Sequence, residues 1–223
     1  MTDLFAIRTN TISRFKSLLS LMREGVLLQF GLRNPRQITK VPGHLLEVDK
    51  DILSKYAKLL NKGSTIVEIG SFLGLSAIIM GLSNRQCRII CIDPCDLSGE
   101  AVSAPIYGKD GYQDAWQFRM LRLHLVLYGV RAQILRATSQ EAIKRFSSRC
   151  QLLFVDGDHS YDACCQDVDL YGKWLDIGGT LILHDATAIG WPGPIKVAEQ
   201  LSKDPAWQFL EERGNCVVFR KLS

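Results

Sequence analysis

The chain has 223 residues, enough for one large domain with a core of its own. Its composition, with 47% hydrophobic and 22% charged residues, is that of a soluble globular protein, and its formal net charge of +4 is mild. Lys and Arg are spread along the sequence, which argues against nucleic acid as a partner. Neither a long apolar run nor a signal-peptide pattern occurs, so we expect no transmembrane segment.

The first 41 residues are expected to form an N-terminal helical extension of a domain that covers residues 42–223. Apolar residues recur there at helical spacing, namely Ile12, Phe15, Leu18, Leu19 and Met22. Packing of this helix on its own domain is the first expectation. A membrane surface or a partner subunit, as in a homodimer, are the alternatives. A second helix is predicted from Glu47 to Leu60.

From Ser64 onward, strand and helix patterns alternate. The predicted strands are 65–69, 87–92, 132–135, 152–155, 180–183, 207–210 and 216–220. The predicted helices are 75–82, 115–128, 140–146, 162–174 and 194–201. Gly178 and Gly179 are expected in a loop, and 95–111 in a long loop that could close over a substrate with Tyr107 and Tyr112. This alternation predicts an α/β fold with a doubly wound, mostly parallel seven-stranded sheet and a C-terminal antiparallel hairpin.

The cysteines indicate a reducing compartment. There are seven, an odd number, with no C-x-x-C pair and no zinc-ligand spacing. Several lie in apolar runs, where a free thiol behaves as a small hydrophobic side chain. A cytoplasmic location is the simplest inference.

The most informative stretch of the sequence runs from Ile66 to Ser76. An apolar strand ends in Glu68-Ile69-Gly70, a loop with a second glycine follows, and a helix begins. Such a turn lets the backbone pass close to a ligand at a helix N-terminus. Phe72 stands where a dinucleotide fingerprint has its second glycine, so a nucleoside with an amino-acid tail, S-adenosylmethionine, fits better than a pyrophosphate. A tight turn without a ligand is the alternative.

Acidic residues follow the other strands at the same predicted edge of the sheet. Asp93 could accept the ribose hydroxyls of a nucleoside, or it could cap its own loop. Thr138-Ser139 could cap the next helix, or a hydroxyl there could reach an adenine. Because ligands bind outside the carboxyl ends of the strands, these groups should meet at one site.

Two accounts of catalysis are open for the turn Asp156-Gly157-Asp158-His159 and for Asp185. In the first, Asp156 and Asp185 hold Mg²⁺, which lowers the pKa of a substrate hydroxyl. In the second, His159 is the general base and no metal takes part. A third interpretation makes His159 and His184 structural.

Taken in order, five motifs resemble class I S-adenosylmethionine-dependent methyltransferases. They are Val67-Glu68-Ile69-Gly70-Ser71, Ile92-Asp93-Pro94, the stretch 154–161 (F-V-D-G-D-H-S-Y), Gly178-Gly179 and Leu183-His184-Asp185. More narrowly, residues 42–220 are similar to small bacterial O-methyltransferases with V-D-G-D-H-S-Y and L-H-D signatures, relatives of the catechol and caffeoyl-CoA enzymes.

This resemblance implies a Rossmann-like methyltransferase that transfers a methyl group from S-adenosylmethionine to a small-molecule hydroxyl or, less favoured, an amine. The implied cofactor-binding residues are Glu68, Gly70, Ser71, Ser76, Asp93, Ser139, Asp156 and His159, with His159 and Asp156 as catalytic residues. Metal-dependent relatives also hold a divalent ion at the places of Asp156 and Asp185, but Ala186 and His184 depart from their pattern. An NAD-dependent oxidoreductase and a non-catalytic partner subunit are the alternative functions.

Overall fold

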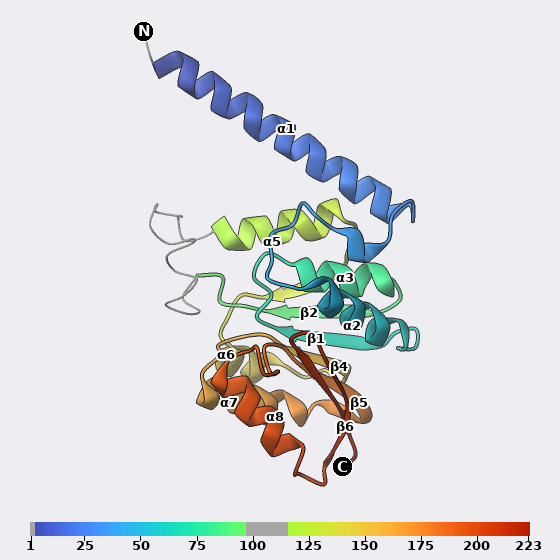
Figure 1. The fold of residues 1–223 in the computed structure, drawn as a ribbon. Helices are drawn as coiled ribbons and strands as arrows, with labels where there is room; N and C mark the ends of the chain where they lie inside the picture. The colour runs from blue at the N-terminus through green and yellow to red at the C-terminus, as the bar shows by residue number, and fades with distance from the viewer. Residues whose placement is uncertain (1–2, 97–115) are drawn as a thin grey trace.

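The computed structural model describes residues 3–96 and 116–223 as a three-layer α/β fold (Figure 1). Its sheet has seven strands in the order β3-β2-β1-β4-β5-β7-β6. The strands are β1 Thr65–Ile69, β2 Arg88–Ile92, β3 Ala132–Leu135, β4 Cys150–Val155, β5 Leu175–Leu183, β6 Trp207–Arg213 and β7 Cys216–Lys221. The first five pair in parallel, and β7 pairs antiparallel with both β5 and β6. The predicted fold class, with its closing hairpin, is confirmed.

Helices cover both faces of the sheet (Figure 1). On one side lie α1 Asp3–Gln29, α2 Glu47–Lys58, α3 Leu75–Ser83 and α5 Trp116–Leu127. The short 3₁₀ turn η1 Pro35–Gln37 lies between α1 and α2 in the chain. On the other side lie α6 Ser139–Ala142 with η2 Ile143–Arg145, α7 Tyr161–Gly172 and α8 Pro192–Leu201. The central strands β1, β2 and β4 are almost wholly buried, as expected where helices cover both faces of a parallel sheet. Along β1, for example, Ile66 belongs to the core under α2 and α3, whereas Val67 belongs to the core under α7 and α8.

Helix α1 confirms a helix in the N-terminal region but buries a different face from the predicted one. Leu18, Leu19 and Met22 are 38–48% exposed, whereas Glu24 is buried. The Glu24 carboxylate accepts hydrogen bonds from the Tyr128 hydroxyl at 2.6 Å and from the backbone of residue 39 at 3.1 Å. A Cβ on Gly25 would lie 2.3 Å from the carbonyl oxygen of residue 127, so the helix approaches the end of α5 very closely there. The hydrophobic pattern missed this face because a carboxylate and a glycine form part of it.

The predicted loop at Gly178 and Gly179 is wrong, since both residues lie inside β5. The pairing of β4 with β5 shifts register between Cys150 and Leu152, and this irregularity accommodates the glycines within the strand. Residues 97–115 are outside the described part of the chain, so most of the predicted loop at 95–111, with Tyr107 and Tyr112, is not described. No helix among the described residues is long and apolar enough to cross a membrane.

Candidate functional site

A cavity of about 650 Å³ opens at the carboxyl ends of β1, β2, β4 and β5. This is the edge of the sheet where the sequence predicts a ligand site. Most of the predicted site residues line it, namely Gly70, Ser71, Ser76, Asp93, Ser139, Asp156, His159 and Asp185. The fold therefore brings together groups that are up to 115 positions apart in the sequence.

The turn after β1 depends on Gly70. Its φ of +83° lies in the left-handed region, and a Cβ there would stand 2.0 Å from the carbonyl oxygen of Asp156. The backbone nitrogen of Gly70 donates to the carbonyl oxygen of Ile92 at 2.9 Å, which ties the turn to the end of β2. Any side chain at this position would separate the ends of β1 and β4.

Asp93, at the end of β2, caps the loop beside it. Its carboxylate accepts hydrogen bonds from the backbone nitrogens of Phe72 and Cys95, both at 2.7 Å, and from the side chain of Gln117 at 3.0 Å. Burial raises the pKa of Asp93, and these donors oppose the rise. The capping interpretation is therefore present in the structure, and the ribose contact stays a prediction.

Thr138 and Ser139 follow β3, and the sequence leaves helix capping and adenine contact open for them. Thr138 caps α6, because its hydroxyl accepts a hydrogen bond from the backbone of Glu141 at 3.3 Å. Ser139 is buried and lines the cavity, and its carbonyl oxygen accepts a hydrogen bond from the Tyr171 hydroxyl at 2.8 Å. Ser139 therefore lies in the cavity wall, and the contact of its hydroxyl with an adenine stays a prediction.

Glu68 lies beneath the cavity and does not line it. It is 0% exposed, and neither carboxylate oxygen has a hydrogen-bond partner among the described residues. Burial raises the pKa of Glu68 to about 7, although the nearby hydroxyls of Ser71 and Ser76 oppose the rise. Any effect of Glu68 on a ligand has to pass through residues that do line the cavity.

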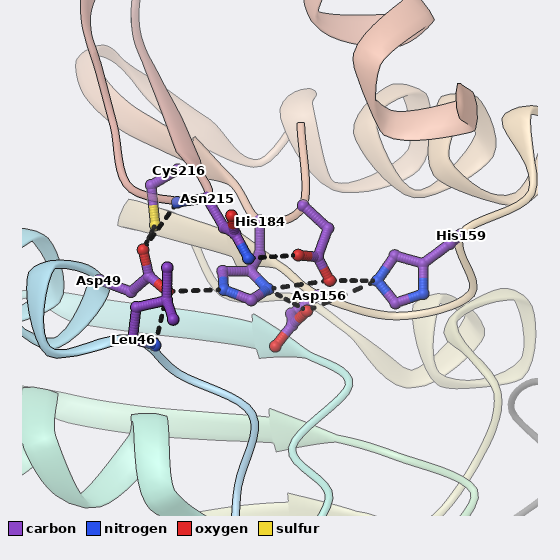
Figure 2. Close-up of polar contacts among 8 residues, drawn as sticks. Leu46, Asp49, Asp156, His159, His184, Asn215 and Cys216 are labelled. Carbon is purple, nitrogen blue, oxygen red and sulfur yellow. Dashed lines mark hydrogen bonds and ion pairs between the residues drawn. The ribbon is translucent and has the colours of Figure 1, made fainter. Parts of the chain in front are cut away.

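At the other end of the cavity, His184 lies between carboxylates (Figure 2). Its Nδ1 is 2.9 Å from Asp156 Oδ1 and 3.4 Å from Asp185 Oδ2, and its Nε2 is 3.3 Å from Asp49 Oδ2. Carboxylates only accept hydrogen bonds, so both ring nitrogens carry a proton and His184 is a cation. Burial alone would lower the pKa of His184, but these carboxylates raise it well above its ordinary value.

Asp49 is the site residue that sequence reasoning missed. It comes from α2, is 0% exposed, and also accepts hydrogen bonds from the backbone nitrogens of Leu46 and Asn215, both at 2.8 Å (Figure 2). Its spacing from Ile52, Leu53 and Tyr56 places it on the buried face of that helix. A carboxylate at such a position was the available signal.

His159 forms the wall next to this cluster. Its Nε2 lies 3.1 Å from Asp185 Oδ2, and its ring stacks on Trp191 with centroids 5.6 Å apart and an interplanar angle of 24°. Burial alone would raise the pKa of Asp185, but hydrogen bonds from His159 and His184 lower it below its ordinary value. The structure thus joins His159 to a carboxylate that stays ionised and can orient its ring.

Comparison with known proteins assigns the sequence to a family. Residues 67–186 match the sequence model of the family described as a methyltransferase domain. The chain belongs to this family. Among curated proteins, it is 26% identical over 155 residues to the uncharacterized protein R132 of Acanthamoeba polyphaga mimivirus. That match covers 67% of this chain, and the chain spans 64% of the length of the viral protein.

Solved structures of methyltransferases share the fold. The O-methyltransferase NovP is 15% identical, with a TM-score of 0.63 over 93% of this chain and 100% of that one. An O-methyltransferase from Bacillus cereus in complex with SAH is 11% identical, with a TM-score of 0.58 over 92% and 91% of the two chains. The SAH-bound methyltransferase PaMTH1 of Podospora anserina is 15% identical, with a TM-score of 0.58 over 100% and 97%.

Proposed function

We propose that this methyltransferase-family chain transfers a methyl group from S-adenosylmethionine to a hydroxyl group of a small molecule. One observation carries the proposal. A single cavity at the carboxyl edge of the sheet joins the Gly70 turn and Asp93 to His159 with its orienting Asp185. An amine acceptor is the less favoured version of the same reaction.

The cavity residues fit the cofactor in chemical type. The Ser71 hydroxyl is buried and has no hydrogen-bond partner among the described residues, so a ligand could supply one. Asp156 gives one oxygen to His184 at 2.9 Å, and we assign its other oxygen to the amino group of the methionine part. Gly70, Ser71 and Ser76 would surround that part, with Glu68 beneath them. Asp93 would meet the ribose and Ser139 the adenine.

When bound, S-adenosylmethionine would supply a methyl group on a positively charged sulfur. His159 would take the proton of the acceptor hydroxyl, so that the oxygen attacks the methyl carbon as the carbon–sulfur bond breaks. If the ring proton is on Nε2, which lies 3.1 Å from Asp185 Oδ2, Nδ1 of His159 would be the proton acceptor. Asp185 would hold the ring in this tautomer and stabilise its charge after the transfer.

The residues present do not fit the Mg²⁺ ion that the sequence analysis holds open. Asp156, His184 and Asp185 each place one ligand atom within 4.8 Å of the others, as a metal site requires. However, Mg²⁺ prefers oxygen ligands, and here Nδ1 of protonated His184 contacts one oxygen of Asp156 and one of Asp185, so a cation already lies between these carboxylates. We therefore assign proton removal to His159 alone.

Calorimetric titration of the pure protein with S-adenosylhomocysteine tests the function most simply. We expect one binding site per chain, and titration with NADH under the same conditions should give no binding. Absence of S-adenosylhomocysteine binding would overturn the proposal, and tight NADH binding would favour an oxidoreductase. Titration with MgCl₂ should give no binding heat, and a stoichiometric Mg²⁺ site would contradict the metal-free assignment.

The catalytic assignment needs an acceptor, found by screening hydroxylated small molecules for formation of S-adenosylhomocysteine. With that acceptor, His159→Asn should lower kcat by about 10²–10⁴-fold, because the general base is lost. Its affinity for S-adenosylhomocysteine should stay within a few-fold of wild type. An unchanged kcat would show that another group removes the proton.

A homodimer through α1 is a separate proposal about partners. Leu18, Leu19, Met22 and Val26 are all exposed on the part of this helix whose side chains are described. Light scattering should give twice the mass of one chain for wild type and the mass of one chain for Met22→Glu. A monomeric wild type would remove the proposal.

The cytoplasmic location stays a prediction, and all seven cysteines are free thiols.

A further inference from the structure

A second buried carboxyl group lines the cavity at a place that the mechanism above does not use. Asp167 projects from α7, is 3% exposed, and belongs to the wall of the cavity near Ser139. Helices α6 and α7 pack on the same face of the sheet, where the Tyr171 hydroxyl bonds to the carbonyl oxygen of Ser139. Asp167 therefore lies at the end of the cavity that is built by α6 and α7.

The carboxyl group of Asp167 has few hydrogen-bond donors around it. Oδ1 has no hydrogen-bond partner among the described residues. Burial raises the pKa of Asp167 to about 6, the Ser139 hydroxyl opposes the rise, and Asp158 adds to it. At neutral pH the group is mostly ionised, and a buried carboxylate with an unused oxygen is costly unless a ligand supplies a donor.

Gly157 keeps this carboxyl group open to the cavity. A Cβ at Gly157 would lie 3.2 Å from Asp167 Oδ2, a tight contact that would require one of the two groups to shift slightly. Any side chain at this position would crowd the carboxylate, and Gly157 itself lines the cavity. The absence of a side chain at position 157 thus leaves the space beside the Asp167 carboxylate unfilled by the chain.

The placement of the cofactor decides which ligand group would meet Asp167. If the amino-acid part lies on the Gly70 turn and the ribose at Asp93, the base extends past β2 toward the residues that follow β3. Those residues include Ser139, the neighbour of Asp167. Adenine carries one amino group, at its 6-position, and this group can donate to a carboxylate.

We infer that Asp167 accepts a hydrogen bond from the 6-amino group of the cofactor's adenine and makes the site selective for adenosyl over inosyl ligands. This inference rests on the proposed function, because it assumes the same cofactor in the same cavity. In an inosyl ligand a carbonyl oxygen replaces the amino group, so in the same pose two acceptors would face each other, and the base would have to shift to present its N1–H instead. A site with a buried, unpaired acceptor rejects such a ligand strongly.

The test compares S-adenosylhomocysteine with its deaminated analogue, S-inosylhomocysteine, by calorimetric titration. Wild type should bind the adenosyl compound about 10–100-fold more tightly, the value expected for one hydrogen bond to a charged group. In Asp167→Asn the amide can turn either its oxygen or its nitrogen toward the base, so this ratio should fall to about threefold or less. Asp169→Asn, an exposed carboxylate two residues along the same helix, is the matched control and should keep the wild-type ratio.

The outcomes separate the two proposals. If wild type binds neither compound, the proposed function fails and the adenine assignment fails with it. If wild type binds both equally, or Asp167→Asn keeps the wild-type ratio, the cofactor site stands and the role of Asp167 is wrong. Should Asp167→Asn not fold, Asp167→Ser serves in its place, and equal affinity of wild type for the two compounds still overturns the inference.

Discussion

Two groups of buried acids near the two ends of the cavity differ in their hydrogen bonding. Asp93 and Asp156 belong to neither group, because burial raises their pKa values although donors bond to them. At the end that we assign to the acceptor, Asp49 and Asp185 have lowered pKa values, despite burial, because His184 and other donors bond to them. At the cofactor end, burial raises the pKa of Glu68 to about 7 and of Asp167 to about 6, and these groups have carboxylate oxygens without partners in the described structure. The paired acids are held in place before any ligand arrives, whereas Asp167 offers an acceptor to one.

The largest test of this contrast removes the cation at the paired end. His184→Ala would leave Asp49, Asp156 and Asp185 without their shared partner, so we expect a loss of about 3–5 kcal/mol of unfolding free energy. Urea unfolding at pH 7 measures it. His44→Ala, at an exposed histidine, should cost well under about 1 kcal/mol. A loss as small for His184→Ala would show that the cluster does not depend on a histidine cation.

Replacing the unpaired acid Glu68 should raise the unfolding free energy, whereas His184→Ala should lower it. The folded pKa of Glu68 is about 7 against an ordinary value of 4.5, so the unfolded chain releases this proton first as pH rises. Glu68 therefore costs stability progressively between these two pH values, and the cost remains above them. The stability of Glu68→Gln relative to wild type should grow by about 2 kcal/mol between pH 5 and pH 8.

Parallel urea titrations at the two pH values check this prediction, because the difference between variant and wild type removes the contribution of other groups. Glu211→Gln is the control, at a partly exposed glutamate whose pKa is lowered by its neighbours Lys55 and Tyr56 although burial opposes this. Its stability relative to wild type should not rise with pH. If Glu68→Gln behaved in the same way, Glu68 would not be an unpaired buried acid.

The smallest effect concerns a single hydrogen bond at the paired end. The Asn215 side chain donates to Asp185 Oδ1 at 2.9 Å, so Asn215→Ala should lower the unfolding free energy by about 1–2 kcal/mol. The same urea titration measures the loss, with Asn61→Ala, at an exposed asparagine, as its control. A loss as large as that of His184→Ala would mean that the cluster is held by its hairpin more than by its histidine.

Much of the fold could be predicted because local patterns agree with the tertiary structure. The strands at 65–69 and 132–135 have the predicted bounds, since each is a short apolar run between a turn and a polar stretch. The start of β5 could not be predicted, because its glycines indicate a loop and only pairing with β4 makes them part of a strand. The buried face of α1 was missed because Glu24 and Gly25 carry no hydrophobic signal.

The candidate site divides in a similar way. Residues that directly follow strands, such as Asp93, Asp156 and Asp185, could be placed in one cavity because parallel strands end at one edge of the sheet. Asp49 and Asp167 lie inside helices and reach the site only through helix packing. Their burial depends on which face of each helix meets the sheet, and the short apolar patterns around them do not specify a ligand or a histidine partner.

A crystal structure of the protein with S-adenosylhomocysteine is the most direct test of the central claim that the strand-end cavity is an adenosyl cofactor site. We predict the amino group of the ligand within hydrogen-bonding distance of Asp156 and the 6-amino group of its adenine within hydrogen-bonding distance of Asp167. A ligand bound elsewhere, or one that left both carboxylates without contact in this cavity, would contradict the claim.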